Sequence, residues 1–373
     1  MKDKIGIITF HKACNYGAIL QTYALQTILK KFFFEYDVEV IDYYCPAIED
    51  RTSPFYFIND GNFVKNTLRF MYLFIPKYKK YKLFRKFRKQ YICETKTRYD
   101  ENNIEITNDK FIAIFTGSDQ VWNLNATKGD KNYFLSFASE KIYKCSYAAS
   151  FGFDEIIDEY YDELVPLMKK FDYISLRENI GITNLFKRNK IKTYTNLDPT
   201  MLLTSRDWDA LIVNTKRKIH EKYILLYCVL KTKRLIDYAK QLSEKTGLPV
   251  YSISNHSDFS CFHQLKSCSV EDFVCLIKNA TYVLTTSFHG TVFSILYHKK
   301  FVTEIDTVQS KNTRVENLLN ILEISNRAID SSKFYDINKI EWSNVDLKLH
   351  SYVGEAEEYL GNIKRTMEGE RRK

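Results

Sequence analysis

The residue types best suited to chemistry stand together between residues 282 and 297. This stretch opens with the apolar character of a buried strand, and a helical apolar pattern begins after Gly290. A helix that starts directly after a strand presents backbone N–H groups that bind anions, and a histidine there can move a proton near neutral pH. The sequence therefore predicts an anion site with an acid–base group, formed by Ser287, His289, Gly290 and Thr291.

The same stretch has a simpler interpretation. Serine and threonine are common N-caps of helices, so residues 285–289 would also suit an ordinary strand-to-helix turn. In that case His289 would only make a hydrogen bond within the protein. Helix N-termini are common in proteins and most of them bind no ligand.

A second polar group follows the predicted strand at residues 111–115. Ser118, Asp119 and Gln120 supply groups that hydrogen-bond to hydroxyls, and Asp119 can also accept a proton. Trp122 has a flat apolar face of the kind on which sugars stack. We therefore expect a polyhydroxylated ligand near these residues.

A third group ends the short predicted strand within residues 172–178, where Ser175 and Arg177 stand. The planar guanidinium of Arg177 can bind a carboxylate or phosphate through two parallel hydrogen bonds. An ion pair with Glu178, or one between domains, would explain the arginine equally well.

The N-terminal region reads as strand, turn, helix and strand between residues 5 and 43, which opens a doubly wound parallel sheet. Ligands of such sheets lie beyond the carboxyl ends of the strands, so Asn15, Tyr16 and Gly17 are predicted to line the ligand cleft. Asn15 and Gly17 also suit a tight turn with positive φ. The chain has no GxGxxG motif, so no dinucleotide site is predicted.

The length of 373 residues indicates two domains, at roughly 150 residues per domain. We expect an α/β protein with two Rossmann-like domains that face a cleft. The predicted division is an N-terminal α/β domain at 1–204 with a basic aromatic insertion at 51–100, a C-terminal α/β domain at 205–350 that carries the Ser-Phe-His-Gly motif, and a helix at 351–373 that crosses back.

Basic residues exceed acidic ones by nine, which favours anionic small molecules, phosphates or a membrane surface over nucleic acid. Residues 65–89 contain ten Lys or Arg and no acid, interleaved with aromatic and aliphatic side chains. Such a segment could bring the protein to an anionic membrane and a lipid-linked substrate. The alternative is a solvated helical pair whose aromatic stripe packs on the domain.

The eight cysteines form no CxxC pair and no zinc pattern, so they are expected to be reduced core residues of a cytosolic protein that needs no metal. The sequence shows no signal peptide pattern and no run of about 18 apolar residues that would span a membrane. We expect a cytoplasmic protein, and the membrane interpretation of residues 65–89 would place it at the inner face of the membrane.

Six motifs together resemble the polysaccharide pyruvyl transferase family over roughly residues 5–325. They lie in this order: residues 15–26 (NYGAILQTYALQ), 117–123 (GSDQVWN), 146–152 (SYAASFG), 174–178 (ISLRE), 197–200 (LDPT) and 287–290 (SFHG). The resemblance implies a two-lobed fold of the glycosyltransferase-B type. It also implies that a pyruvyl group moves from phosphoenolpyruvate to two hydroxyls of a sugar, making a cyclic ketal in a capsular polysaccharide or exopolysaccharide.

The resemblance assigns roles to particular residues. His289 and Arg177 match the positions that serve phosphoenolpyruvate, the donor, and no cofactor is implied. Asp119 is then expected to orient or deprotonate an acceptor hydroxyl in the first domain, whereas Asp198 is expected to support the turn before Pro199.

One motif departs from the family pattern. Members resemble Arg-Leu-His where this chain has Ser287, Phe288 and His289, so one cation of the motif is missing. Arg314 is our candidate substitute, and Lys311 is the second. The same departure leaves open an alternative function, a nucleotide-sugar-dependent glycosyltransferase of the same two-lobed fold, whose diphosphate would lie at the helix N-terminus.

Overall fold

The computed structural model describes residues 2–56, 63–152, 161–178, 186–213, 215, 217–229, 232–253, 260–305, 313–329, 337 and 340–370. The chain folds into two compact units. Unit 1 contains Met1–Tyr56, Arg88–Leu202 and His350–Lys373, and unit 2 contains Phe57–Phe87 and Leu203–Leu349.

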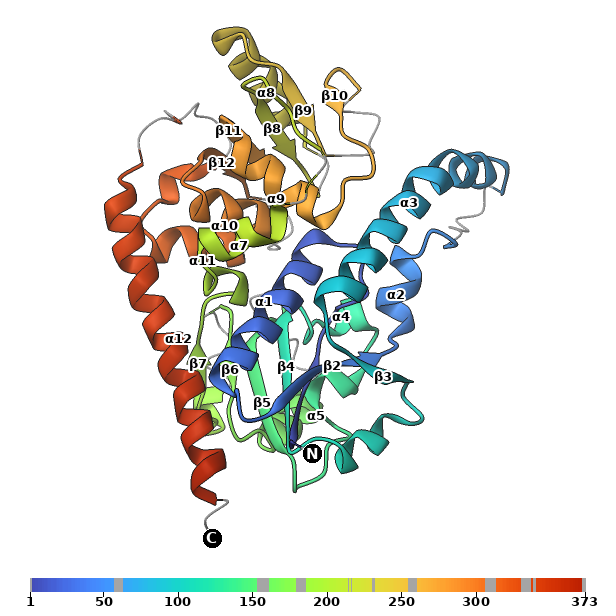
Figure 1. Ribbon diagram of the computed structural model, residues 1–373, viewed down its shortest axis with the longest axis vertical. Helices are drawn as coiled ribbons and strands as arrows, with labels where there is room; N and C mark the ends of the chain where they lie inside the picture. Colours follow the sequence, from blue (N-terminus) through green and yellow to red (C-terminus); the bar gives the residue numbers. More distant parts are fainter. Residues whose placement is uncertain are drawn as a thin grey trace. The chain divides into compact units, whose positions relative to one another are not determined.

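Unit 1 is built on a sheet that has seven parallel strands among its described residues, in the order β3-β2-β1-β4-β5-β6-β7 (Figure 1). The strands are β1 (Lys4–Ile8), β2 (Asp37–Tyr43), β3 (Glu94–Tyr99), β4 (Ala113–Asp119), β5 (Tyr143–Ala149), β6 (Ser175–Leu176) and β7 (Tyr194–Thr195). The helices that accompany them are α1 (Tyr16–Phe32), α2 (Pro46–Thr52), α4 (Leu124–Thr127) and α5 (Tyr161–Met168). Because all strands run in the same direction, their carboxyl ends share one edge.

The first helix of unit 1 begins where a cap is available. The Asn15 side chain accepts hydrogen bonds from the backbone N–H groups of Gly17, at 2.8 Å, and Ala18, at 3.3 Å. These bonds satisfy two of the donors that the start of a helix leaves without partners. Helix α1 is buried along most of its length and thereby fixes the turn that follows β1.

Residues 51–100 differ from the sequence prediction in three ways. They contain one long helix, α3 (Phe63–Tyr91), rather than a helical pair, and Pro76 lies inside it without ending it. They also contain β3, an edge strand of the first sheet where we predicted no strand. Most of α3 belongs to unit 2, although the sequence analysis grouped this segment with the first domain.

Unit 2 has a second sheet, with six parallel strands among its described residues in the order β10-β9-β8-β11-β12-β13 (Figure 1). The strands are β8 (Ile224–Tyr227), β9 (Val250–Ser252), β10 (His263–Gln264), β11 (Tyr282–Thr285), β12 (Lys300–Glu304) and β13 (Ala328–Ile329). The helices are α7 (Ser205–Ile212), α8 (Lys233–Thr246), α9 (Val270–Asn279), α10 (Phe288–Leu296) and α11 (Thr313–Ile321).

The last helix, α12 (Trp342–Glu370), begins in unit 2 and ends in unit 1. In unit 1 its Tyr359 is buried, and the hydroxyl donates a 2.7 Å hydrogen bond to the carbonyl of Ser146 on β5. The ring of Tyr359 also contacts the rings of Tyr147 and Tyr194, with centroids 6.3 and 5.0 Å apart. The C-terminal part of the chain is therefore packed into the core of unit 1.

Candidate functional site

The polar residues of unit 1 gather at the carboxyl ends of β4, β5 and β6, where the turn after β4 has a tightly constrained backbone. Gly117 has a φ of 114°, and a Cβ added there would lie 2.4 Å from the carbonyl oxygen of Tyr147 on β5. Only glycine allows the two strands to approach so closely. Asp119 follows with a φ of 71°, in the left-handed region that Asp tolerates better than most residues. Glycine at 117 is therefore needed to bring Asp119 to the sheet edge.

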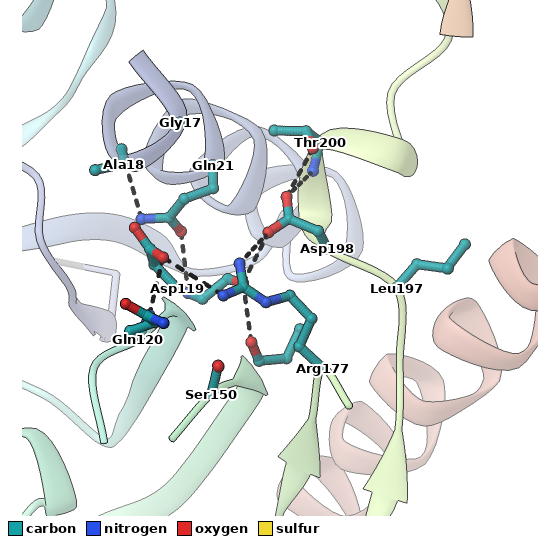
Figure 2. Close-up of polar contacts among 12 residues, drawn as sticks. Gly17, Ala18, Gln21, Asp119, Gln120, Ser150, Arg177, Leu197, Asp198 and Thr200 are labelled. Atoms are coloured by element: carbon teal, nitrogen blue, oxygen red, sulfur yellow. Dashed lines mark hydrogen bonds and ion pairs between the residues drawn. The ribbon is translucent and has the colours of Figure 1, made fainter. Parts of the chain in front are cut away.

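Arg177 is the centre of this cluster (Figure 2). Its guanidinium donates a 2.9 Å hydrogen bond to Asp198 and lies 3.5 Å from Asp119, and its Nε lies 3.8 Å from Glu178. The side chain of Arg177 is 2% exposed and that of Asp198 is fully buried, whereas that of Asp119 is 17% exposed. The structure thus contains the Arg177–Glu178 contact that the sequence left open as an alternative, together with two stronger carboxylate partners.

Electrostatics keep this arginine charged. Burial works to lower the pKa of Arg177, but the attraction of Asp119, Asp198 and Glu178 outweighs it and raises that pKa above its usual value. Three carboxylates around one guanidinium leave the cluster short of positive charge. The arrangement therefore suits neutral hydroxyl ligands better than an anionic one.

Asp198 has two functions in this cluster. One of its carboxylate oxygens accepts hydrogen bonds from the backbone N–H of Thr200, at 3.0 Å, and from the Thr200 hydroxyl, at 2.7 Å. These bonds cap the short 3-10 helix Pro199–Met201, which confirms the structural role predicted for this residue. The other oxygen binds Arg177, and the sequence analysis missed this second contact. Because the two residues are 21 positions apart on different strand ends, only their position at one sheet edge could have indicated it.

Helix α1 is joined to the same edge by a buried glutamine (Figure 2). Gln21 accepts a 3.0 Å hydrogen bond from the backbone N–H of Ser118, and its amide nitrogen donates to Thr9 and Ala18. Ser118 in turn donates to the carbonyl of Ala148 and lies 3.2 Å from a carboxylate oxygen of Asp198. Ser118 and Gln21 are fully buried, so both hold the framework in place.

Several predicted ligand-binding residues of unit 1 are instead committed to the fold. Tyr16 and Gly17 are buried in α1, and Asn15 is exposed but caps that helix. Ser175 is fully buried, and its hydroxyl accepts hydrogen bonds from the backbone N–H of Ala148 and the Asn196 side chain. The tight turn with positive φ that was the alternative for Asn15 and Gly17 is not formed, because Asn15 caps α1 with a φ of −119° and Gly17 lies inside that helix.

Trp122 is fully buried, which corrects the prediction that it stacks on a sugar. Its indole N–H donates a 2.9 Å hydrogen bond to the carbonyl of Tyr133, and its ring stacks on Phe134 at 5.6 Å. A second aromatic contact joins it to Phe151. Both faces of the indole are therefore used for packing in the core of unit 1.

Asp119 and Gln120 are the partly exposed members of the polar group that follows β4. The carboxylate of Asp119 accepts a 2.9 Å hydrogen bond from the backbone N–H of Gln120. The Gln120 side chain lies against Gly152, where an added Cβ would come within 2.2 Å of the amide nitrogen. Asp119 thus combines a fixed orientation with access to solvent, which a residue that binds a hydroxyl requires.

The predicted anion site in unit 2 has the expected local structure. Helix α10 begins directly after β11, and the Ser287 side chain caps it by accepting a hydrogen bond from the backbone N–H of Gly290 at 3.3 Å. The Thr291 hydroxyl donates to the carbonyl of Ser287 at 3.1 Å and is fully buried. The side chains of Ser287 and Thr291 therefore both serve the turn, as the simpler interpretation predicted.

His289 and Arg314 both contact the ring of Phe288. The Arg314 guanidinium lies 5.8 Å from the centre of the Phe288 ring, which meets the His289 ring edge-on at 5.1 Å. His289 is 6% exposed and lies in the first turn of α10, at the positive end of the helix dipole. Arg314 and His289 thus supply a cation and an imidazole near the N-terminus of α10, which is nine residues long. Lys311, our second candidate cation, lies outside the described residues.

Of the three predicted catalytic side chains, Asp119 and Arg177 belong to unit 1 and His289 belongs to unit 2. Among the residues that the structure describes, no group of three or more His, Cys, Asp or Glu side chains could hold a metal ion. A search of the same residues found no helix with the length and apolar character needed to cross a membrane.

Comparison with known proteins gave one family and a set of structural neighbours. The family model described as polysaccharide pyruvyl transferase matches residues 15–303. No curated protein matched the chain. A Listeria monocytogenes protein named as a UDP-N-acetylglucosamine 2-epimerase superimposes with a TM-score of 0.51 at 9% identity, covering 96% of this chain and 90% of that one.

Two further neighbours are more distant. The UDP-GlcNAc 2-epimerase of Methanocaldococcus jannaschii gives a TM-score of 0.49 at 12% identity, covering 93% of this chain and 92% of its own. The E. coli heptosyltransferase WaaC with ADP gives 0.40 at 10% identity, covering 94% and 99%. The similarity to the Listeria protein concerns the fold alone. Together with the two parallel-sheet α/β units, it confirms the predicted glycosyltransferase-B-like fold.

Proposed function

Because the chain belongs to the polysaccharide pyruvyl transferase family and is therefore a transferase, we propose that its donor is phosphoenolpyruvate. The proposed product is a cyclic ketal. The acceptor is a sugar with two hydroxyls placed to close the ketal ring, in a capsular polysaccharide or exopolysaccharide. The observation that carries this proposal is the family match across residues 15–303.

The reaction follows from the chemistry of an enol phosphate. A proton adds to the methylene carbon of phosphoenolpyruvate, which makes the neighbouring carbon electrophilic. One sugar hydroxyl attacks that carbon, inorganic phosphate leaves, and the second hydroxyl attacks to close the ketal. One hydroxyl proton balances the proton taken up by the methylene carbon, and the other leaves with the phosphate. The donor carries its own leaving group, so the proposal includes no cofactor.

Unit 2 is proposed to bind the donor. The N-terminus of α10 offers backbone N–H groups and a positive dipole end to the phosphate, and Arg314 supplies the cation that the Ser-Phe-His-Gly motif lacks. His289 acts as the general acid for the methylene carbon or holds the phosphate. General acid catalysis of this kind contributes about 10²–10⁴-fold to a rate.

Unit 1 is proposed to bind the acceptor. Asp119 is fixed in orientation and partly exposed, so its carboxylate can orient a sugar hydroxyl or remove its proton. Arg177 is almost fully buried beside carboxylates, so we assign it the task of positioning Asp119 rather than of binding the donor directly. This role replaces the one that the family resemblance suggested for Arg177.

The acceptor is further proposed to be lipid-linked and presented at the cytoplasmic face of the membrane. Support comes from the ten basic residues between 65 and 89 and from the exposure of Met71, Tyr72 and Ile75 on the same helix, α3. Bilayers with anionic lipids attract such segments.

The test is to incubate the enzyme with a sugar acceptor and either phosphoenolpyruvate or a set of nucleotide sugars. Phosphoenolpyruvate should give a product heavier by one pyruvyl ketal, with one equivalent of phosphate released. A product heavier by one sugar residue, formed only with a nucleotide sugar, would reject the proposal in favour of the glycosyltransferase alternative.

A further inference from the structure

Unit 2 contains a pocket of about 480 Å³, and none of its lining residues belongs to the six family motifs. It lies between α3 and the loop that joins β10 to α9, and its lining residues are Ile75, Pro76, Lys79, Lys82, Leu83, Arg217, Lys266 and Ser267. The volume falls within the range of about 300–1,000 Å³ that is usual for small-molecule sites. Four of the lining residues are cations and three are apolar.

The pocket is lined by basic and apolar side chains together with Ser267. Among the residues that the structure describes, no Asp or Glu lines it, although Asp272 lies 3.5 Å from Arg217. Lys79, Lys82 and Lys266 are exposed, so they keep their charge in contact with water. Such a wall attracts an anion with an apolar body better than a small inorganic ion.

The wall is held in place by contacts between its two sides. The Ser267 hydroxyl donates a 3.1 Å hydrogen bond to the carbonyl of Pro76, which joins the loop to the middle of α3. Arg217 donates to the carbonyl of Lys266 at 3.3 Å, and its contact with Asp272 holds it near the start of α9. The pocket is therefore a built feature of unit 2 rather than a gap beside an isolated helix.

The helix that forms one wall continues into an exposed apolar surface. Met71, Tyr72 and Ile75 are 66%, 72% and 60% exposed, and Ile75 belongs to both this surface and the pocket. The positions 71, 75, 79 and 82 follow each other at helical spacing, so apolar and basic side chains share one face of α3. A helix face of this composition binds in the interfacial layer of a bilayer.

We propose that this pocket binds the phosphate group of an anionic lipid while Met71, Tyr72 and Ile75 enter the interfacial layer of the same bilayer. The inference rests on the proposed function for its membrane setting and adds a defined docking site to it. The cations contact the lipid phosphate, and Ile75, Pro76 and Leu83 contact the glycerol backbone and the first methylene groups of the chains.

The experiment is flotation with vesicles of phosphatidylcholine alone and of phosphatidylcholine mixed with phosphatidic acid. The native protein should bind only the anionic vesicles. Each lysine near an anionic surface strengthens binding by roughly fivefold, so the double variant Lys79→Gln and Lys82→Gln should weaken it by roughly thirtyfold. The control double variant, Lys240→Gln and Lys245→Gln, removes the same charge from exposed positions on α8 and should weaken it less than about threefold.

A second pair of variants tests the apolar surface. Met71→Ser should weaken vesicle binding severalfold, whereas Leu347→Ser, at a position 71% exposed on α12, should leave it unchanged. Thermal unfolding of all variants checks that they fold. A competition experiment adds soluble glycerol phosphate to the anionic vesicles. If low concentrations displace the protein, the pocket binds soluble phosphate compounds, and the lipid assignment is overturned.

The remaining results also decide the question. No binding of the native protein to anionic vesicles, or equal losses in the pocket and α8 variants, would refute the docking site. Transfer to a soluble acceptor is measured in parallel and should be unchanged in the pocket variants. Vesicle binding without pyruvyl transfer would reject the proposed function alone, whereas transfer without vesicle binding would reject the docking site alone.

Discussion

The guanidinium of Arg177 donates a 2.9 Å hydrogen bond to Asp198, and the side chains of both residues are almost completely removed from solvent. A buried charge keeps its place only while its partner remains, because taking an unpaired ion out of water is costly. This pair fixes the position of the guanidinium that also contacts Asp119, the partly exposed carboxylate of the same sheet edge. The orientation of Asp119 is thus linked to the buried pair through the guanidinium of Arg177.

The first prediction concerns this buried pair. Asp198→Asn removes the carboxylate that accepts the 2.9 Å hydrogen bond of Arg177 but leaves Asp119 and Glu178 beside the guanidinium, so the free energy of unfolding should fall by about 1–3 kcal/mol, as measured by urea denaturation. Glu163→Gln is the control, because its ion pair with Lys131 in unit 1 is roughly half exposed on both sides. That change should cost less than about 1 kcal/mol. Equal effects of the two substitutions would contradict the importance of the buried pair.

The second prediction concerns Asp119. Asp119→Asn keeps the shape of the side chain and tolerates the positive φ at this position, so the protein should remain folded. If the carboxylate removes a proton from the acceptor, kcat should fall by about 10²–10⁴-fold with little change in the KM for phosphoenolpyruvate. Steady-state kinetics with varied donor and acceptor would check this, and near-native kcat would remove Asp119 from the chemical step.

The sequence predicted local structure at the sites much better than it predicted long-range partners. The turn between β11 and α10 was placed correctly because an apolar strand, a serine cap and a helical apolar pattern follow one another without interruption. Arg177 was singled out, but its contacts to Asp119 and Asp198 join residues 58 and 21 positions apart. Parallel strands are joined by long crossover connections, so residues at their ends meet only in the folded sheet. A local sequence pattern therefore does not predict these contacts.

The same limit explains the error at Trp122. Its buried position depends on Phe134 and Phe151, which approach from the segments before and after β5. A tryptophan after a strand looks the same in the sequence whether it faces solvent or the core. Helix α3 illustrates the opposite case, since local composition suggested its basic and aromatic character but not that it would continue through Pro76.

The third prediction concerns His289. His289→Ala should abolish measurable phosphate release from phosphoenolpyruvate, or lower it by about 10²–10⁴-fold, because the general acid or phosphate ligand is lost. The control is His298→Ala, at an exposed histidine paired with Asp346 in the same unit, which should retain activity. Circular dichroism of both variants checks the fold. Activity of the His289 variant equal to that of the control would show that the imidazole takes no part in turnover.

The fourth prediction is a pH dependence of stability in unit 1. Although burial works to raise it, the Lys12 ammonium and the nearby His11 side chain hold the pKa of Asp42 at about 2, below its ordinary value of 3.8. A depressed pKa in the folded state adds stability that is complete above the unfolded pKa and is lost as the pH falls towards the folded pKa. The native protein should therefore lose on the order of 2 kcal/mol through this group between about pH 5 and pH 2.

Asp42→Asn tests that linkage, because the variant should be less stable by on the order of 2 kcal/mol at neutral pH and should lose less stability on acidification. Urea denaturation at several pH values would measure both effects. Parallel curves for the variant and the native protein would mean that Asp42 does not carry this dependence.

The last prediction separates structure from ligand binding in the Ser-Phe-His-Gly motif. A Cβ added at Gly290 would lie 2.4 Å from the Thr285 hydroxyl oxygen, on the strand against which α10 packs. Gly290→Ala must therefore shift α10 or β11 and should destabilise unit 2 by about 1–3 kcal/mol. Gly354→Ala, on a face of α12 where the added Cβ meets nothing within 4 Å, should be neutral or stabilise by up to about 1 kcal/mol. If both variants are equally stable and only Gly290→Ala loses activity, glycine is required at this position for the ligand and not for packing.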